Sequence, residues 1–285
     1  MKSKIINAEN LDPQPLLLIN KEGVRKYWGK SESDVCEILK DLQEWIKKQN
    51  FPEMPTNHMI EFFLTNCKYK VEATKDVLST YYKIRKQVPE IYEDSNPRLS
   101  EIEKSWTMGC YCPLPQLTDD LCRISIVKLD SNTSNFVASS YFANIMNIYE
   151  LRIYEDLCLS EIIICDYSAL SWGHVFKMDI FTVRKMAHIM NSLKNRVKQL
   201  HIVDSPSCIN IIIALAKKLL NKKLADRIVV HKSYDSLYEH VPKDLLPCDY
   251  GGKGRPLEEI IDMWKEKVKQ YQDRFDTLEA WSKSD

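Results

Sequence analysis

Long apolar runs are missing from this sequence of 285 residues. The strongest run, Cys208 to Ala216, contains Asn210 and continues into Lys217 and Lys218, whereas a membrane-spanning helix needs about 20 apolar residues. The beginning, MKSKIINAEN, also lacks the apolar core of a signal peptide. The sequence therefore predicts neither a membrane span nor a secretory leader.

A charge excess is absent too, because 40 basic residues balance 40 acidic ones. This balance argues against a protein that binds nucleic acid through a strongly basic surface, so we expect no nucleic-acid partner. The nine cysteines are an odd number and several lie inside apolar runs, which does not resemble a disulfide framework. We therefore expect a reducing, cytoplasmic environment.

Catalytic motifs are equally scarce. GGKG at 251–254 lacks the earlier glycine and the following Ser or Thr of a phosphate loop, and no G-x-G-x-x-G, G-x-S-x-G or H-E-x-x-H sequence occurs. Asp166 with His174 or His201 could form an acid/base pair, but a polar strand end and core histidines explain them more simply. We expect no enzyme, no catalytic residue and no cofactor.

A metal site is not indicated either. Cys110 and Cys112 form a C-x-C sequence beside Pro113, without a second pair of cysteines or histidines at ligand spacing. We interpret them as two loop thiols and expect no metal.

Two kinds of apolar periodicity are present. Helical spacing predicts three helices joined by short links, which begin near Asp34 and Thr56 and, for the third, run from about Val71 until Pro89. From residue 121 onward, four runs rich in Ile and Val (121–129, 160–167, 198–204 and 226–232) alternate with helical segments (134–158, 175–193 and 207–220). Alternating strands and helices predict an α/β fold with a mixed, largely parallel sheet flanked by helices. The stripe from Pro256 to Leu278 predicts a final single helix.

The segment Ser207 to Leu220 is apolar almost all round its helical axis. Periodicity alone favours a buried core helix, yet five cations follow at once: Lys217, Lys218, Lys222, Lys223 and Arg227. An apolar helix bordered by cations suits reversible binding to anionic lipid, although a solvated helix end would also explain the charges.

Several motifs occur in one order along the chain: EIIICDYSALSW, VKQLHIVDSP, LLNKKLADRIVVH and YEHVPKDLLPCDYGGKGRPLEEI. Together they resemble the CRAL-TRIO lipid-binding domain, and EFFLTNCKYKVEATKDVLSTYYKIRKQVPEIY resembles the helical domain that precedes it in that family. The resemblance implies an N-terminal extension (1–30), a helical domain (31–97), a lipid-binding domain (98–255) and a C-terminal helix (256–285). It also implies a hydrophobic pocket between sheet and helices, closed by a gate helix at 207–220.

The resemblance further implies site residues. Four cations match positions that bind phosphoinositide headgroups in a family member: Arg196, Lys198, Lys223 and Arg227. Another family arginine is missing near Cys67, with Lys68 beside the gap. The implied ligand-binding positions, of which Ile145 and Tyr149 replace two serines of a relative, are Phe142, Ile145, Tyr149, Cys165, Met178, Ile189, Met190, Leu193, Val197, Leu200, Ile209, Ile212 and Ile213. Each of them could equally be a core residue.

These features predict an intracellular carrier that binds one hydrophobic small molecule, such as a retinoid, tocopherol, carotenoid or other lipid. It would transfer this molecule to or between membranes through transient association with anionic surfaces, phosphoinositide-containing ones included. A second hypothesis is a lipid-sensing adaptor whose N-terminal extension or C-terminal helix binds a protein partner. A third, weaker one is a lipid enzyme, which requires Asp166 and His174 to face the pocket.

Overall fold

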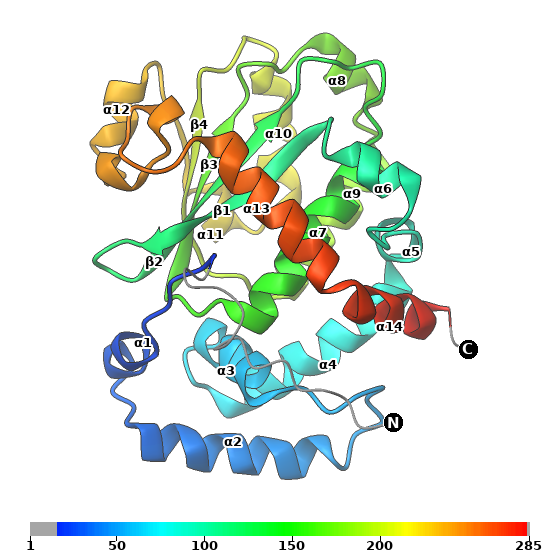
Figure 1. Cartoon of the computed structure of the whole chain (residues 1–285), viewed down its shortest axis with the longest axis vertical. Coiled ribbons are helices and arrows are strands. Elements are labelled where there is room, and N and C mark those ends of the chain that lie inside the picture. Colours follow the sequence, from blue (N-terminus) through cyan, green and yellow to red (C-terminus); the bar gives the residue numbers. More distant parts are fainter. Residues whose placement is uncertain (1–15, 284–285) are drawn as a thin grey trace.

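A five-stranded sheet forms the centre of the computed structural model, which describes residues 16–283 (Figure 1). The strands lie side by side in chain order: β1 (Gly109–Leu117), β2 (Cys122–Leu129), β3 (Ser160–Asp166), β4 (Val197–Val203) and β5 (Ile228–Val230). β1 pairs antiparallel with β2, and all later neighbours pair parallel. The predicted α/β class with a mixed, largely parallel sheet is confirmed.

Helices precede, connect and follow the strands. Before the sheet lie α1 (Lys21–Tyr27), α2 (Glu32–Ile46), α3 (Asn57–Asn66), α4 (Val71–Gln87), α5 (Pro89–Tyr92) and α6 (Ser100–Ser105). Between the strands lie α7 (Ala138–Glu155), α8 (Trp172–Lys177), α9 (Ile180–Ser192), α10 (Ile209–Leu219) and α11 (Lys222–Ala225). After them come α12 (Tyr234–Tyr238), two 3₁₀ turns (Lys243–Leu245 and Cys248–Tyr250), α13 (Leu257–Gln270) and α14 (Gln272–Ser282).

The first strand contradicts the interpretation of Cys110 and Cys112 as loop thiols. Both lie in β1 and are buried. The run escaped detection because Pro113 interrupts it, and proline removes a hydrogen-bond donor from a strand. Proline is tolerated here because β1 is an edge strand that pairs with β2 alone.

Three predicted helix boundaries are wrong. Ser31, rather than Asp34, caps α2, because its hydroxyl accepts from the Asp34 N–H while the Asp34 carboxylate accepts from the Ser31 N–H. The segment 175–193 divides into α8 and α9, since Asp179 accepts from the backbone of Thr182 and starts a new helix. The final helix is two helices, because the chain leaves helical geometry at Tyr271 between α13 and α14.

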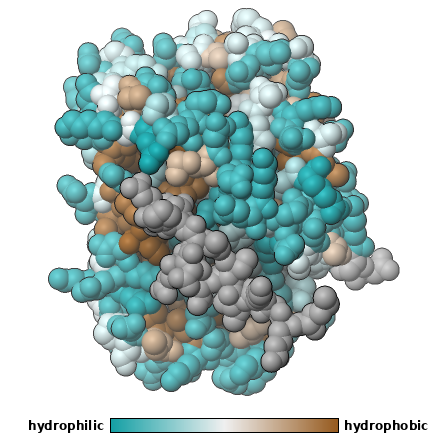
Figure 2. Space-filling model, in the orientation of Figure 1, coloured by the Kyte–Doolittle hydropathy of each residue, from teal (hydrophilic) through white to brown (hydrophobic). Residues whose placement is uncertain are grey.

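The two faces of the sheet are covered differently. Along β3, Ile162 and Ile164 join a core cluster with Trp264 of α13, whereas Ile163 and Cys165 join a separate cluster on the opposite face. This alternation follows from the period of two in a strand. Figure 1 shows α13 crossing the near face, and in Figure 2 the surface over that helix is hydrophilic.

The helical unit packs against α7 and α9 through one shared core. The predicted extension over 1–30 falls outside the described residues up to position 15; from there, Leu16 and Leu17 are buried in the core beside the sheet, and α1 follows. Arg25 of α1 donates to the buried Glu61 of α3 at 2.6 Å, which fixes α1 to the helical unit. Within residues 16–283, no helix combines the length and apolar character needed to cross a membrane.

Candidate functional site

A cavity of about 230 Å³ lies between the sheet and the helices α7, α9 and α10. Its wall is mainly aliphatic and aromatic, with a few polar side chains. One lining thiol, Cys165, is buried, and this burial raises its pKa to about 12. The thiol therefore stays protonated and is no nucleophile, so the cavity suits binding of an apolar molecule better than covalent chemistry.

Most of the ligand-binding positions implied by the sequence border this cavity. Ten do so: Phe142, Ile145, Tyr149, Cys165, Met178, Ile189, Met190, Val197, Leu200 and Ile212. Leu193, Ile209 and Ile213 do not. Leu193 is buried in the core shared with the helical unit, while Ile209 and Ile213 of α10 pack in the core cluster on the cavity side of the sheet. For these three residues the core interpretation fits better.

Sequence reasoning missed the polar lining residues, above all Tyr111, Tyr141, Glu161 and Asn195. Glu161 could have been found, because it precedes Ile163 and Cys165 at the strand period of two and therefore points to the same face. Tyr111 could not, since its strand was not recognised.

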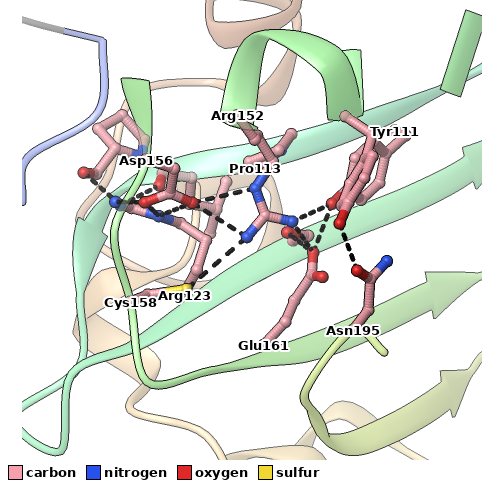
Figure 3. Close-up of polar contacts among 12 residues, drawn as sticks. Tyr111, Pro113, Arg123, Arg152, Asp156, Cys158, Glu161 and Asn195 are labelled. Atoms are coloured by element: carbon pink, nitrogen blue, oxygen red, sulfur yellow. Dashed lines mark hydrogen bonds and ion pairs between the residues drawn. The ribbon is translucent and has the colours of Figure 1, made fainter. Parts of the chain in front are cut away.

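A buried polar network adjoins the cavity (Figure 3). Arg152 of α7 forms an ion pair with Glu161 at 2.7 Å, and Tyr111 donates its hydroxyl proton to the same carboxylate oxygen at 2.6 Å. On its other side Arg152 pairs with Asp156, which Arg123 also contacts at 2.7 Å. Arg123 and Asp156 have no exposed surface, so each charge depends on its partners.

The electrostatics of this network are shown by Asp156. Burial opposes ionisation of its carboxyl group, but the guanidinium groups of Arg123 and Arg152 outweigh burial and lower its pKa to about 2. Asp156 is therefore ionised at neutral pH, and its ion pairs with Arg123 and Arg152 hold α7 against β2 at one end of the cavity.

The helix α10 forms part of the cavity wall and lies at the surface. Ile212, Ala216 and Leu219 face the cavity, whereas Ile211 is 48% exposed on the outer side. Among its residues only Ile209 is buried. The helix is thus apolar on both sides, as the sequence indicated, but it is not a buried core helix.

A basic groove lies beside the cavity. It brings together all four cations implied by the sequence, Arg196, Lys198, Lys223 and Arg227, and adds Lys68 and Lys194. Among residues 16–283, no acidic side chain lines the groove. Lys68, noted beside the missing family arginine, therefore lies in this groove.

Neighbouring groups orient the cations of the groove. The Arg196 guanidinium stacks 4.8 Å from the centre of the Trp28 ring, and Arg227 donates to the backbone carbonyl of Val197. Lys198 is paired with Asp120. Because two arginines are fixed by the fold while the lysines remain at the surface, the groove presents an organised positive charge.

The candidate acid/base pair does not face the cavity. Asp166 accepts from the hydroxyl groups of Tyr250 at 2.6 Å and Ser168 at 2.7 Å, on the α13 side of the sheet. His174 contacts Ser171, and neither Asp166 nor His174 lines the cavity. His201 shares a hydrogen bond of 2.8 Å with His231, and burial lowers its pKa to about 4. The lipid-enzyme hypothesis thus lacks the geometry that it required.

Several known proteins are similar to this chain. Curated relatives called alpha-tocopherol transfer protein-like, from Pongo abelii, Homo sapiens and Mus musculus, are 26%, 26% and 27% identical over 231 residues, or 76% of this chain. The chain spans 65% of the length of those relatives. The crystal structure of Sfh5 aligns with a TM-score of 0.47 and 12% identity, over 89% of this chain and 100% of the other.

Two family models match the chain. One describes a Pinta-like UBA domain and covers residues 31–102, the region of the helical unit. The other covers residues 118–252, which hold β2 to β5, α10 and most of the cavity wall. The chain therefore contains a CRAL/TRIO domain at residues 118–252, and that segment belongs to the CRAL/TRIO family.

Proposed function

We propose that this protein is a non-enzymatic carrier that binds one hydrophobic small molecule in the cavity and exchanges it at anionic membranes. The observation that carries the proposal is the position of α10, an apolar helix between the cavity and the surface, next to a basic groove. The CRAL/TRIO match and the names of the curated relatives support lipid binding and transfer.

Enclosure of the ligand follows from the hydrophobic effect. Transfer of apolar surface out of water contributes about 0.8 kcal/mol per CH₂, so a lipid of some twenty carbons favours a closed cavity by well over 10 kcal/mol. Such a molecule hardly leaves through water. A carrier must therefore open where the ligand meets another apolar phase, and the lightly buried α10 is the wall element suited to swing out as a gate.

Docking would use the basic groove together with exposed apolar residues. Trp172, Phe176 and Phe181, on α8 and the start of α9, are 53%, 81% and 64% exposed, and α9 packs against α10. Aromatic side chains favour the membrane interface, and each cation near an anionic surface contributes about 1 kcal/mol. The groove would bind lipid phosphate groups, phosphoinositides among them.

The groove and the cavity share wall residues, namely Met190, Asn195 and Val197. An anion bound in the groove would therefore lie next to the cavity wall. This contiguity favours ligand exchange at the docking site over exchange at a remote one.

The test is charge reversal at Lys223 and Arg227 together, both changed to Glu. We expect at least about tenfold weaker sedimentation with anionic vesicles and slower transfer of a fluorescent lipid between vesicles, because several kcal/mol of attraction become repulsion. Lys40→Glu on the exposed side of α2 is the control and should change neither. Unchanged transfer by the double variant would refute membrane docking through this groove.

The transfer assay, combined with a pull-down of protein partners, distinguishes the carrier from the lipid-sensing adaptor. A protein that binds lipid, transfers none between vesicles and captures a protein partner only when loaded would be a lipid-sensing adaptor.

A further inference from the structure

Three side chains of the cavity wall, Glu161, Asn195 and Tyr141, each have a polar atom that forms no hydrogen bond within residues 16–283. The carboxylate of Glu161 receives the Arg152, Tyr111 and Ser125 contacts on a single oxygen, Oε1. Among residues 16–283, no group donates a hydrogen bond to its other oxygen, Oε2. Because Glu161 is 7% exposed and lines the cavity, Oε2 is accessible mainly from the cavity.

Asn195 lies next to this carboxylate. The backbone N–H of Glu161 donates to the carbonyl of Arg196 at 2.7 Å, which brings the starts of β3 and β4 together. The Asn195 amide oxygen accepts from the Tyr149 hydroxyl, so its NH₂ group is left to donate. Asn195 lines both the cavity and the basic groove, so this end of the cavity has an acceptor on Glu161 and an amide group beside it.

The third unpartnered group is the hydroxyl of Tyr141. It is buried, lines the cavity and has no hydrogen-bond partner in the described part of the chain. The ring packs with Cys165 and Leu129 in the core at the far end of β3. Glu161 and Cys165 are four residues apart along that strand, which corresponds to about 13 Å.

We infer that the cargo is an uncharged oxygenated lipid, with an alcohol at the Glu161 end and a second oxygen near Tyr141. An alcohol can donate to Oε2 and accept from an amide N–H such as that of Asn195, whereas an ionised carboxylate or phosphate head has no proton to donate to Oε2. A hydrocarbon would leave all three groups unpaired, which is unfavourable in a buried site. This inference rests on the proposed carrier function and specifies its substrate class.

The first experiment measures head-group preference. The purified protein is equilibrated with equimolar hexadecanol, hexadecanoic acid and hexadecane, and the bound species are counted by native mass spectrometry. We expect the alcohol to exceed each of the others by about tenfold or more. In Glu161→Gln, which keeps the shape and removes the charge, the preference of alcohol over acid should fall by about tenfold.

The second experiment concerns the Tyr141 hydroxyl. Tyr141→Phe breaks no hydrogen bond seen in residues 16–283, so this variant should fold and provides a test even if Glu161→Gln does not fold. Wild type should bind dodecanediol about tenfold more tightly than dodecanol, because only the diol places an oxygen at each end, and Tyr141→Phe should abolish that difference.

The outcomes separate the two proposals. Acid binding as tightly as alcohol, or an unchanged diol preference in Tyr141→Phe, would overturn the inferred substrate class and leave the carrier function standing. Failure of every compound to bind, together with no lipid extracted from the purified protein, would overturn both.

Discussion

The two faces of the sheet differ in how completely they are covered. The packed face, which lies against α13, is filled by side chains, whereas the cavity face borders the cavity. On the packed face, beneath α13, side chains such as Ile162, Ile164 and Trp264 form a continuous core. On the cavity face, Ile163 and Cys165 border a space that α10 covers with little burial of its own. The strand residues named on both faces are apolar. The covering helix therefore decides whether the space above a face is filled by side chains.

This difference suggests that one face of the sheet contributes mainly to stability and the other to ligand binding. A packed face contributes most of the stability, because dispersion contacts and apolar burial require close contact. A hollow face gives up some of that stability and gains space for a ligand. Substitutions on the two faces should therefore differ in which property they change.

The largest contrast should come from Trp264. Its side chain is fully buried and its indole N–H donates to the Pro113 carbonyl at 3.0 Å, so Trp264→Ala should lower the free energy of unfolding by about 3–5 kcal/mol. Met190→Ala, on the cavity wall, should cost less than half as much because the side chain already borders a void. Urea unfolding of both variants measures the change in the free energy of unfolding. Equal changes would show that the cavity face is packed as tightly as the packed face.

A smaller effect is expected on the stability of the fold at low pH. The pKa of Asp156 is lowered from 3.8 to about 2 in the folded protein, so the carboxylate stabilises the fold above pH 4 and this contribution disappears as the pH falls toward 2. The loss should be roughly 2 kcal/mol in the free energy of unfolding. Asp156→Asn should lack this step between pH 4 and pH 2 while being less stable at pH 7. An identical pH profile in the variant would contradict the assignment.

The smallest effect on stability is expected at α10, where neighbouring residues face opposite ways. Ile211→Ala should change the free energy of unfolding by less than about 0.5 kcal/mol because the side chain is largely exposed, but should weaken vesicle binding. Ile212→Ala should change lipid binding and leave vesicle binding unaltered, since that side chain faces the cavity. Equal effects of both substitutions on both assays would contradict the proposal that α10 faces the cavity on one side and the membrane on the other.

Particular residues show how far sequence reasoning reached. The resemblance to the CRAL-TRIO family implied Arg196, Lys198, Lys223 and Arg227, which line one groove in the structure. Local charge density alone pointed only to the last two of these. Lys194 was not anticipated as a groove residue, because only the packing of α9 against neighbouring segments brings it there. The exposed aromatic residues of α8 and α9 were missed too, because an amphipathic pattern does not show which apolar residues remain uncovered.

Periodicity and composition by themselves determined the parallel sheet, the helical unit and the apolar helix beside a cluster of cations, because each rests on residues close together in the chain. Tertiary structure alone decided which apolar residues border a cavity and which fill a core. It also made an edge strand of the proline-containing segment around Cys110 and Cys112, and it brought Tyr111, Arg152 and Glu161 into one network. The physical reason is that cavities and buried ion pairs arise between segments distant in sequence, where no local pattern records the contact.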